Sequence, residues 1–247
     1  MIAINNEPNG VNINDKCGAV NVKELSKKVL ELKADIGFAF DGDGDRLIVV
    51  DEKGNEVDGD KIIALFSTYL LDKKIKNHKF PVIGTVMSNL GLEKYLSSKL
   101  KINIKRSSVG DINVIKEMRK FKSCLGGEQS GHIILSKYSK TGDGILAALK
   151  VTEIMSISKK RTSQLFNLYE STPQIKINIP YKSLSDKAKK NINNLSKKNN
   201  RNKKLRSLIR FSGTEPLIRI LVEGDNKKKI SEYGKILEKE IRVNLGK

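Results

Sequence analysis

The hexapeptide Asp41-Gly42-Asp43-Gly44-Asp45-Arg46 lies between two short apolar runs, residues 36–40 and 47–50. Each run has the length and composition of a buried strand, so the sequence predicts an acidic loop between two strands. Carboxylates placed this close together repel one another unless a cation compensates them. Because the loop offers hard carboxylate oxygens without His or Cys, it favours Mg²⁺, Mn²⁺ or Ca²⁺. We expect its two glycines to permit the backbone angles that turn alternate side chains toward one ion.

Two other interpretations of this loop compete with a metal site. One is an acidic turn surrounded by solvent, because Asp-rich hairpins are common, and the sequence leaves it open. The other is an EF-hand calcium loop, with the three aspartates at its first, third and fifth positions and Glu52 at its twelfth. That loop needs a glycine at its sixth position, where Arg46 stands, and helices on both sides. We therefore exclude the EF-hand.

The composition is that of a globular chain. With 247 residues, 38% of them hydrophobic, the chain is long enough for a large core and for one to three domains. No apolar run approaches the ~20 residues of a membrane span, and the first residues lack a signal-peptide pattern, so we expect no membrane association. Cys17 and Cys124 have no metal-type spacing, which indicates a reducing compartment, and we expect a cytoplasmic protein.

The formal net charge of +19 raises the question of nucleic-acid binding. The excess is mostly lysine and is spread over the whole chain. Its densest part, residues 187–206, contains no aromatic residue on which a base could stack. We therefore do not expect a nucleic-acid partner, and a basic enzyme that acts on phosphorylated substrates fits the same charge.

Three successive units are predicted along the chain. Residues 1–57 hold one helix, two or three strands and a hairpin turn, which we interpret as the tail of an α/β domain. Residues 58–163 alternate strands and helices, as in a complete three-layer α/β domain. Residues 172–247 form a smaller C-terminal α+β domain, and residues 164–171 join it to the second unit.

The helices and strands follow from apolar periodicity and from turn residues. In the first unit we expect a helix at 22–32 and the turn at 52–55. In the second, Asp58 or Asp60 caps one helix and Asp111 caps another; the helices are expected at 62–70, 89–100, 111–121 and 144–158, and strands at 81–86 and 102–105. In the third, we expect strands at 175–179, 205–210 and 217–222, a Lys/Asn-rich helical or loop segment, and a helix at 226–243.

A second notable loop is Gly126-Gly127-Glu128-Gln129-Ser130-Gly131-His132. It places a carboxylate, an amide, a hydroxyl and an imidazole between glycines, a group suited to the several hydroxyls of a sugar. It is not a serine-nucleophile motif, because the spacing is not Gly-x-Ser-x-Gly. An ordinary polar glycine loop between two strands remains the alternative.

The third loop is Arg210-Phe211-Ser212-Gly213-Thr214-Glu215-Pro216. Its arginine offers a planar fork for phosphate, and its hydroxyls and backbone N–H groups add donors in a tight turn. It lacks the lysine and the following helix of a nucleotide P-loop. Taken alone, such a turn is also compatible with an ordinary Ser-Gly-Thr turn.

Together the three loops resemble the α-D-phosphohexomutases, and within them the bacterial phosphoglucosamine mutases. The resemblance follows the family's order over essentially the whole chain, and the Gly-Gly-Glu-Gln-Ser-Gly-His form favours the glucosamine branch. The stretches that carry it are residues 12–18, 39–46, 57–60, 85–91, 126–132 and 210–216.

The resemblance implies an intramolecular phosphotransferase that interconverts glucosamine 6-phosphate and glucosamine 1-phosphate, for amino-sugar nucleotide and cell-wall precursor synthesis. A phosphoserine and a 1,6-bisphosphate intermediate carry the phosphoryl group, and Mg²⁺ is the cofactor. The implied site residues are Asp41, Asp43 and Asp45 for the metal, Arg46 beside the transferring phosphoryl group, Glu128 and Ser130 on the sugar hydroxyls with His132 nearby, and Arg210, Ser212, Gly213 and Thr214 on the phosphate that does not react.

Two departures from the family's pattern stand out. The phosphoserine of the family lies in a Thr-Ala-Ser-His-Asn segment, and these 247 residues contain no such segment. In addition, Ile112 stands where the branch carries an arginine, beside Asp111, a candidate proton-transfer group.

Several functions therefore stay open at this point. The chain is part of a mutase, either one piece of a split enzyme that works with a separately encoded N-terminal piece or a truncated reading of a longer gene. Alternatively, it is another phosphohexomutase, or an inactive remnant that still binds sugar phosphates. In each case we expect the chain alone to lack mutase activity, because the serine nucleophile is missing.

Overall fold

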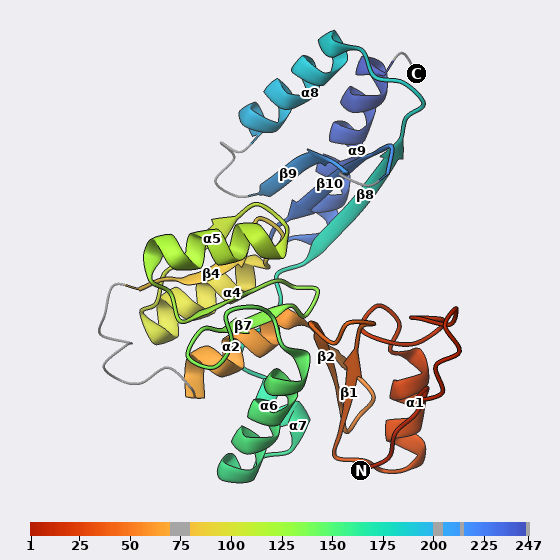
Figure 1. Ribbon diagram of the computed structural model, residues 1–247. Helices are drawn as coiled ribbons and strands as arrows, with labels where there is room; N and C mark the ends of the chain where they lie inside the picture. Colours follow the sequence, from red (N-terminus) through yellow and green to blue (C-terminus); the bar gives the residue numbers. More distant parts are fainter. Residues whose placement is uncertain (70–79, 200–204, 213–214, 246–247) are drawn as a thin grey trace. The chain divides into compact units, whose positions relative to one another are not determined.

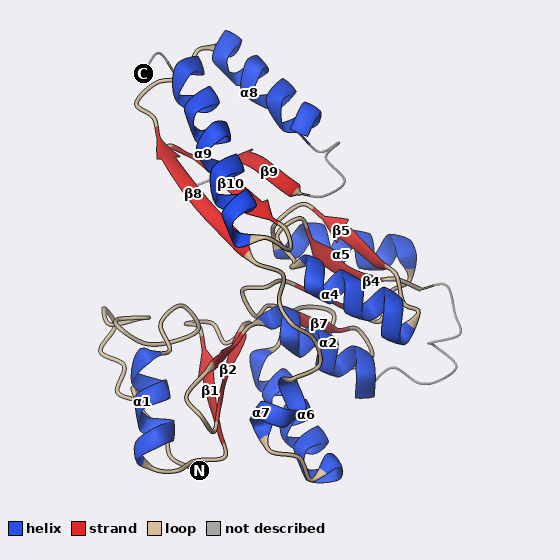
Figure 2. Ribbon diagram, turned by 180° about the vertical axis from the view of Figure 1, so that it is seen from behind, coloured by secondary structure: helices blue, strands red, loops and turns tan. Residues whose placement is uncertain are grey.

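The computed structural model of the protein describes residues 1–69, 80–199, 205–212 and 215–245. The chain divides into two compact units, Met1–Glu170 and Ser171–Lys247, each described here by itself (Figures 1 and 2). The domain boundaries predicted at residues 57, 163 and 172 remain predictions. Among the described helices, none combines the length and the apolar composition that a membrane span needs.

The opening part of the first unit is a small antiparallel sheet between helices, as the tail of an α/β domain requires. Its elements are α1 (Lys23–Glu31), β1 (Ile36–Phe40), β2 (Leu47–Asp51), β3 (Glu56–Val57) and, later in the chain, α6 (Gly144–Ser158). Helix α1 packs on one face, where Val29 meets Ile48 and Val50. Leu47 and Val49 alternate to the other face and join the main core, to which α6 also contributes. Because both faces are covered, β2 is buried along its whole length.

A four-stranded mixed sheet forms the rest of the first unit. Its elements are α2 (Gly59–Tyr69), β4 (Val82–Thr85), α4 (Leu90–Tyr95), β5 (Ile104–Ser107), α5 (Asp111–Phe121), β6 (Leu125–Gly127) and β7 (Ile133–Leu135). The strand order is β5-β4-β6-β7, with β4 parallel to β5 and β6. Helix α5 covers one face through Val114 and Met118, and α2 and α4 lie against the main core on the other (Figure 1). The predicted three-layer α/β arrangement is confirmed.

The helix expected at 89–100 is present as α4 and one further π-helical turn, η1 (Leu96–Leu100). Two other local expectations in this part were wrong. Lys101 has φ +57° after this turn, and the strand expected at 102–105 begins only at Ile104. Asp111 does not cap α5, because Gly110 is the N-cap residue and Asp111 is already helical.

The segment expected as a linker at 164–171 begins within a helix. It contains most of α7 (Thr162–Phe166), whose Leu165 and Phe166 are buried in the main core with Leu47. Both residues are apolar in the sequence, but two apolar residues among turn residues are too few to predict a helix.

The second unit is an antiparallel sheet with two helices on one face. Its elements are β8 (Gln174–Pro180), α8 (Asp186–Asn199), β9 (Arg206–Phe211), β10 (Leu217–Glu223) and α9 (Lys227–Asn244). The strand order is β8-β10-β9, and Ile218 and Ile220 of the central strand face a core shared with Ile192 and Leu237 of the helices. The predicted α+β domain is confirmed, and the Lys/Asn-rich segment is helical over α8.

A carboxylate ties the β2–β3 turn to helix α7. Glu52 accepts hydrogen bonds from the backbone N–H of Ser163 (2.8 Å) and from its hydroxyl (2.5 Å). Burial by itself raises the pKa of Glu52, but the bonds from Ser163 outweigh it and hold that pKa below its ordinary value of 4.5. The carboxylate therefore stabilises the fold in its charged form.

We predict that Glu52→Ala lowers the free energy of unfolding by about 1–2 kcal/mol at pH 7, the usual cost of losing a helix cap. Because the folded-state pKa is depressed, the difference from the parent should be complete above pH 5 and shrink as the pH falls through the folded pKa. Urea unfolding at several pH values measures it. Glu56→Ala, which removes an exposed carboxylate from β3, is the matched control; an equal effect of both changes would contradict the assignment.

Candidate functional site

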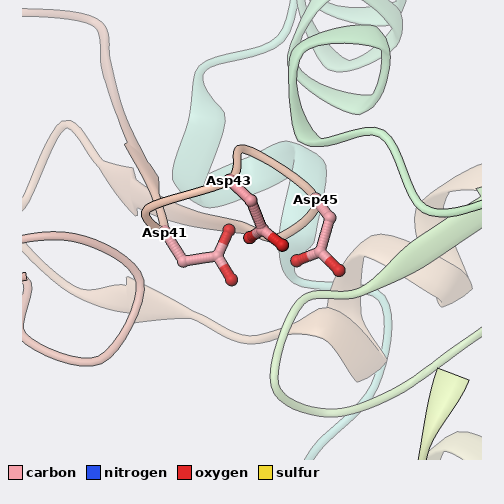
Figure 3. A group of neighbouring side chains, drawn as sticks. All are labelled: Asp41, Asp43 and Asp45. Carbon is pink, nitrogen blue, oxygen red and sulfur yellow. The ribbon is translucent and has the colours of Figure 1, made fainter. Parts of the chain in front are cut away.

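The three aspartates of the acidic loop converge in the structure. Asp41, Asp43 and Asp45 each present a carboxylate oxygen, and these oxygens lie within 4.8 Å of one another. Figure 3 shows the three side chains projecting to the same side of the loop. The convergence expected from the alternating spacing is therefore present.

Of the two glycines of this loop, only Gly44 has the backbone conformation that was expected. Gly44 has φ +71°, a left-handed conformation that favours glycine, as expected. Gly42 does not have a positive φ, so the conformational explanation was wrong for it. A Cβ at position 42 would meet only the end of the Ile13 side chain, which is 70% exposed and free to move aside, so this contact does not require a glycine.

The acidic loop carries a charge imbalance. Burial, a hydrogen bond with Asp41 and the charges of Asp41 and Asp43 raise the pKa of Asp45, and His132 acts in the opposite direction. Asp45 Oδ1 is buried and has no hydrogen-bond partner within the described part of the chain. Arg46 offsets part of this negative charge. Its backbone N–H donates to Asp41 Oδ1 (3.0 Å), and its Nε lies 3.3 Å from Asp41 Oδ2. Arg46 Nε also lies 3.7 Å from Asp45 Oδ1. An oxygen that has no hydrogen bond and lies among repelling carboxylates fits a hard cation.

The acidic loop is bonded directly to the polar loop at 126–132. His132 is 2% exposed, and its Nδ1 lies 2.8 Å from Asp45 Oδ2 across 87 positions of sequence. Backbone contacts support this bond, because Arg46 forms a β-bridge with His132 and the N–H of Leu47 donates to the carbonyl oxygen of Gly131 (3.0 Å). The imidazole thus faces a predicted metal ligand, whereas the sequence placed it near the sugar.

A third segment, residues 141–144, closes on the acidic loop, and the sequence analysis read it only as a helix start. The N–H of Gly144 donates to the carbonyl oxygen of Gly44 (2.9 Å), and Asp143 caps α6. A Cβ on Gly144 would overlap the carbonyl oxygens of Gly44 and Arg46, and one on Gly142 would overlap the His132 ring. The signal was the Thr-Gly-Asp-Gly pattern, with glycines at alternate positions as in the acidic loop.

The two predicted sugar ligands differ in exposure. Glu128 is 8% exposed and its Oε1 accepts from the N–H of Gly110 (2.9 Å), whereas Ser130 is exposed. Gly110 and Glu128 follow the parallel strands β5 and β6, so the carboxyl ends of these strands bring them together. Gln129 stands between Glu128 and Ser130 in the sequence. Its Nε2 donates to Asp58 Oδ2 (3.1 Å), a contact that the sequence did not predict.

The departure at position 112 lies on the surface. Ile112 is 74% exposed and Asp111 is exposed in the first turn of α5. Both directly follow Gly110, whose backbone N–H donates to Glu128 of the polar loop. Asp111 as a proton-transfer group stays a prediction.

The predicted phosphate-binding residues belong to the second unit. Arg210 lies in β9 directly opposite Arg219 of β10, and the N–H of Ser212 donates to the carbonyl oxygen of Leu217 (2.8 Å). Gly213 and Thr214 lie outside the described residues. Like charges opposite one another destabilise a sheet, and Arg219 was not noticed in the sequence.

Three regions of the chain match successive domains of one protein family. Residues 5–54 match "Phosphoglucomutase/phosphomannomutase, alpha/beta/alpha domain II", residues 58–172 match its "alpha/beta/alpha domain III", and residues 177–239 match its "C-terminal domain". Together these regions leave residues 1–4, 55–57, 173–176 and 240–247 unmatched.

Individual relatives agree with this result. The chain is 44% identical over 241 residues to the phosphoglucosamine mutase of Campylobacter curvus and 46% identical over 238 residues to that of Nautilia profundicola. These alignments cover 97% and 94% of this chain but 53% and 52% of the relatives, so the chain spans about half the length of the relatives it matches.

Solved structures show the same fold. A phosphoglucomutase/phosphomannomutase family protein of Burkholderia thailandensis matches with a TM-score of 0.76 at 21% identity, over 92% of this chain and 50% of that one. The N-acetylphosphoglucosamine mutase of Aspergillus fumigatus, solved with GlcNAc-6P and magnesium, matches with a TM-score of 0.72 at 20% identity, over 94% of this chain and 54% of that one. The chain therefore belongs to the phosphohexomutase family and contains the regions that correspond to that family's domains II, III and IV.

Proposed function

We propose that this chain supplies the metal-, sugar- and phosphate-binding parts of a cytoplasmic phosphoglucosamine mutase, which interconverts glucosamine 6-phosphate and glucosamine 1-phosphate. The observation that carries this proposal is the hydrogen bond between His132 and Asp45, because it holds the acidic loop next to the polar loop at 126–132. Relatives of that name at 44% and 46% identity support the choice of glucosamine over other hexoses.

Asp41, Asp43 and Asp45 are the residues that would hold Mg²⁺. Their oxygens converge, and the buried Oδ1 of Asp45 leaves a position for a cation to fill. All three ligands are hard carboxylate oxygens, the type that Mg²⁺ prefers. When bound, the ion supplies positive charge that offsets the charge of a phosphoryl group in transfer.

The other residues of the first unit bind and orient. The guanidinium of Arg46 is 40% exposed beside the carboxylates, so it can donate to phosphoryl oxygens without leaving Asp41. Glu128 and Ser130 bind the sugar hydroxyls as acceptor and donor. His132 acts through Asp45, whose carboxylate it orients, since its ring is buried and bonded there.

In the second unit, Arg210 and Ser212 would grip the phosphate that does not react, with Gly213 and Thr214 as the family pattern implies. Arg219, opposite Arg210, adds a second cation at the same end of the hairpin. Two guanidinium groups on neighbouring strands suit a dianionic phosphate, which accepts several charge-assisted hydrogen bonds.

The nucleophile of the proposed reaction is a phosphoserine. It gives its phosphoryl group to glucosamine 6-phosphate, and the resulting 1,6-bisphosphate reorients and returns its 6-phosphate to the serine, which leaves glucosamine 1-phosphate. The serine belongs to the Thr-Ala-Ser-His-Asn segment, which these 247 residues do not contain. A polypeptide with that segment, joined to this chain or separate, is the partner that the reaction needs.

Reconstitution tests the proposed function. The purified chain is mixed with the half of the Campylobacter curvus phosphoglucosamine mutase that this chain does not match, together with Mg²⁺, glucosamine 6-phosphate and catalytic bisphosphate. We expect turnover only in the mixture, approaching the ~10 s⁻¹ of ordinary enzymes. Preference for glucose or mannose phosphates would favour another phosphohexomutase, and sugar-phosphate binding without any turnover would favour an inactive remnant.

Asp43→Asn tests the metal assignment. We expect it to weaken Mg²⁺ binding at least tenfold, because it replaces a charged ligand by a neutral amide. Isothermal titration of the chain with Mg²⁺ gives the affinity. Asp186→Asn, which neutralises an exposed carboxylate of α8, is the control and should leave it unchanged. Unchanged affinity in Asp43→Asn would remove the metal site.

Arg210→Lys tests the phosphate assignment. Lysine keeps the charge but loses the planar fork, so we expect binding of glucosamine 6-phosphate to weaken by ~1–3 kcal/mol. The control is Arg242→Lys, the same change at an arginine that pairs with Glu238 within α9. Equal affinity of the parent chain for glucosamine and glucosamine 6-phosphate would argue against any phosphate clamp.

A further inference from the structure

We propose that Asp58 and Gln129 form a positioning pair that sets the conformation of the 128–131 loop and thereby the affinity for the sugar. The inference rests on the proposed function, because it assigns how that sugar-binding loop is held. Gln129 would act without being a sugar ligand itself, although it lies between the two residues that are, Glu128 and Ser130.

Gln129 is held at both its side chain and its backbone by the start of α2. Its Nε2 donates to Asp58 Oδ2 (3.1 Å), and its carbonyl oxygen accepts from the N–H of Gly59 (3.0 Å). Asp58 and Gly59 lie 71 and 70 positions before Gln129 in the sequence. Together they hold both the side chain and the backbone of that residue. A residue held in this way cannot rotate independently of the helix.

The loop lies directly against the helix start, with no room to shift toward it. A Cβ at Gly59 would overlap the carbonyl oxygen of Glu128 and lie 3.0 Å from Gly131 Cα. Gly131 N–H in turn donates to the Glu128 carbonyl oxygen (3.0 Å), so residues 128–131 form one tight turn. Gln129 is a central residue of that turn, and its anchoring orients both neighbours.

The two oxygens of Asp58 serve different partners. Oδ1 accepts from the N–H of Lys61 (3.1 Å) and caps α2, whereas Oδ2 accepts from Gln129. Burial raises the pKa of Asp58, and the bonds from Lys61 and Gln129 oppose that effect. Because the roles are divided between the oxygens, a substitution can remove one and keep the other.

Two variants exploit this division. Asp58→Ser keeps a hydroxyl that caps a helix but cannot reach Gln129. Gln129→Met keeps the length of the side chain and removes its donors, without touching the cap. Both are studied in the full chain, and Gln174→Met is the matched control, since Gln174 Nε2 donates to a carboxylate of Glu223 (2.8 Å) in the second unit.

Hydrogen–deuterium exchange of peptides that cover residues 126–132 measures the loop without any ligand. We expect each variant to raise exchange there about tenfold, the double variant to add nothing further, and Gln174→Met to leave it unchanged. Gln129→Glu places two carboxylates face to face, and Asp58→Asn combined with Gln129→Glu restores the bond with donor and acceptor exchanged. Rescue of slow exchange by that pair is expected. Unchanged exchange in both single variants would overturn the proposal.

Titration with glucosamine 6-phosphate measures the consequence for the sugar. We expect its Kd to rise about tenfold in Asp58→Ser and in Gln129→Met, with the Kd for Mg²⁺ unchanged. An unchanged sugar Kd beside faster exchange would overturn the inference. Failure of the parent chain to bind glucosamine 6-phosphate would overturn the proposed function instead, and the exchange data would then still decide whether the pair positions the loop.

Discussion

Repulsion among Asp41, Asp43 and Asp45 is the constraint around which the first unit is arranged. Their oxygens lie within 4.8 Å of one another, and burial and like charge raise the pKa of Asp45. The protein answers with Arg46 on one side and with the imidazole of His132 on the other. Arg46 supplies one positive charge, which does not neutralise three carboxylates, so the cluster could hold a cation.

Holding these groups in place requires backbone to approach backbone closely. Residues 44 and 144 are joined by a hydrogen bond, and the acidic loop is joined to 131–132 by another, so three distant segments share one small region. At Gly131, Gly142 and Gly144 a Cβ would overlap carbonyl oxygens or the histidine ring, so these contacts require glycine. The buried strand β2 and the helix α6 carry these segments, and the main core that they share keeps the loops from separating.

The sequence predicted the acidic loop and its flanking strands, where the signal was local and strong. Apolar runs predicted the strands around the acidic loop, and alternating aspartates predicted the convergence of their side chains. The contacts that join distant segments were out of reach, because no spacing in the sequence pairs His132 with Asp45 or Gln129 with Asp58. The local errors have physical causes as well: the left-handed Lys101 delayed a strand, and Gly110 replaced the acidic residue expected as a cap.

The second unit offers an independent electrostatic argument for an anionic ligand. Arg206 and Glu223 lie opposite each other on β9 and β10 and form an ion pair of 2.6 Å, the arrangement that stabilises neighbouring strands. Two pairs further along the same face, Arg210 lies opposite Arg219. Arg219 also forms an ion pair with the exposed Glu215. Arg210 and Arg219 place two guanidinium groups side by side at the end of this hairpin, an arrangement that suits the phosphate-binding role proposed for the loop.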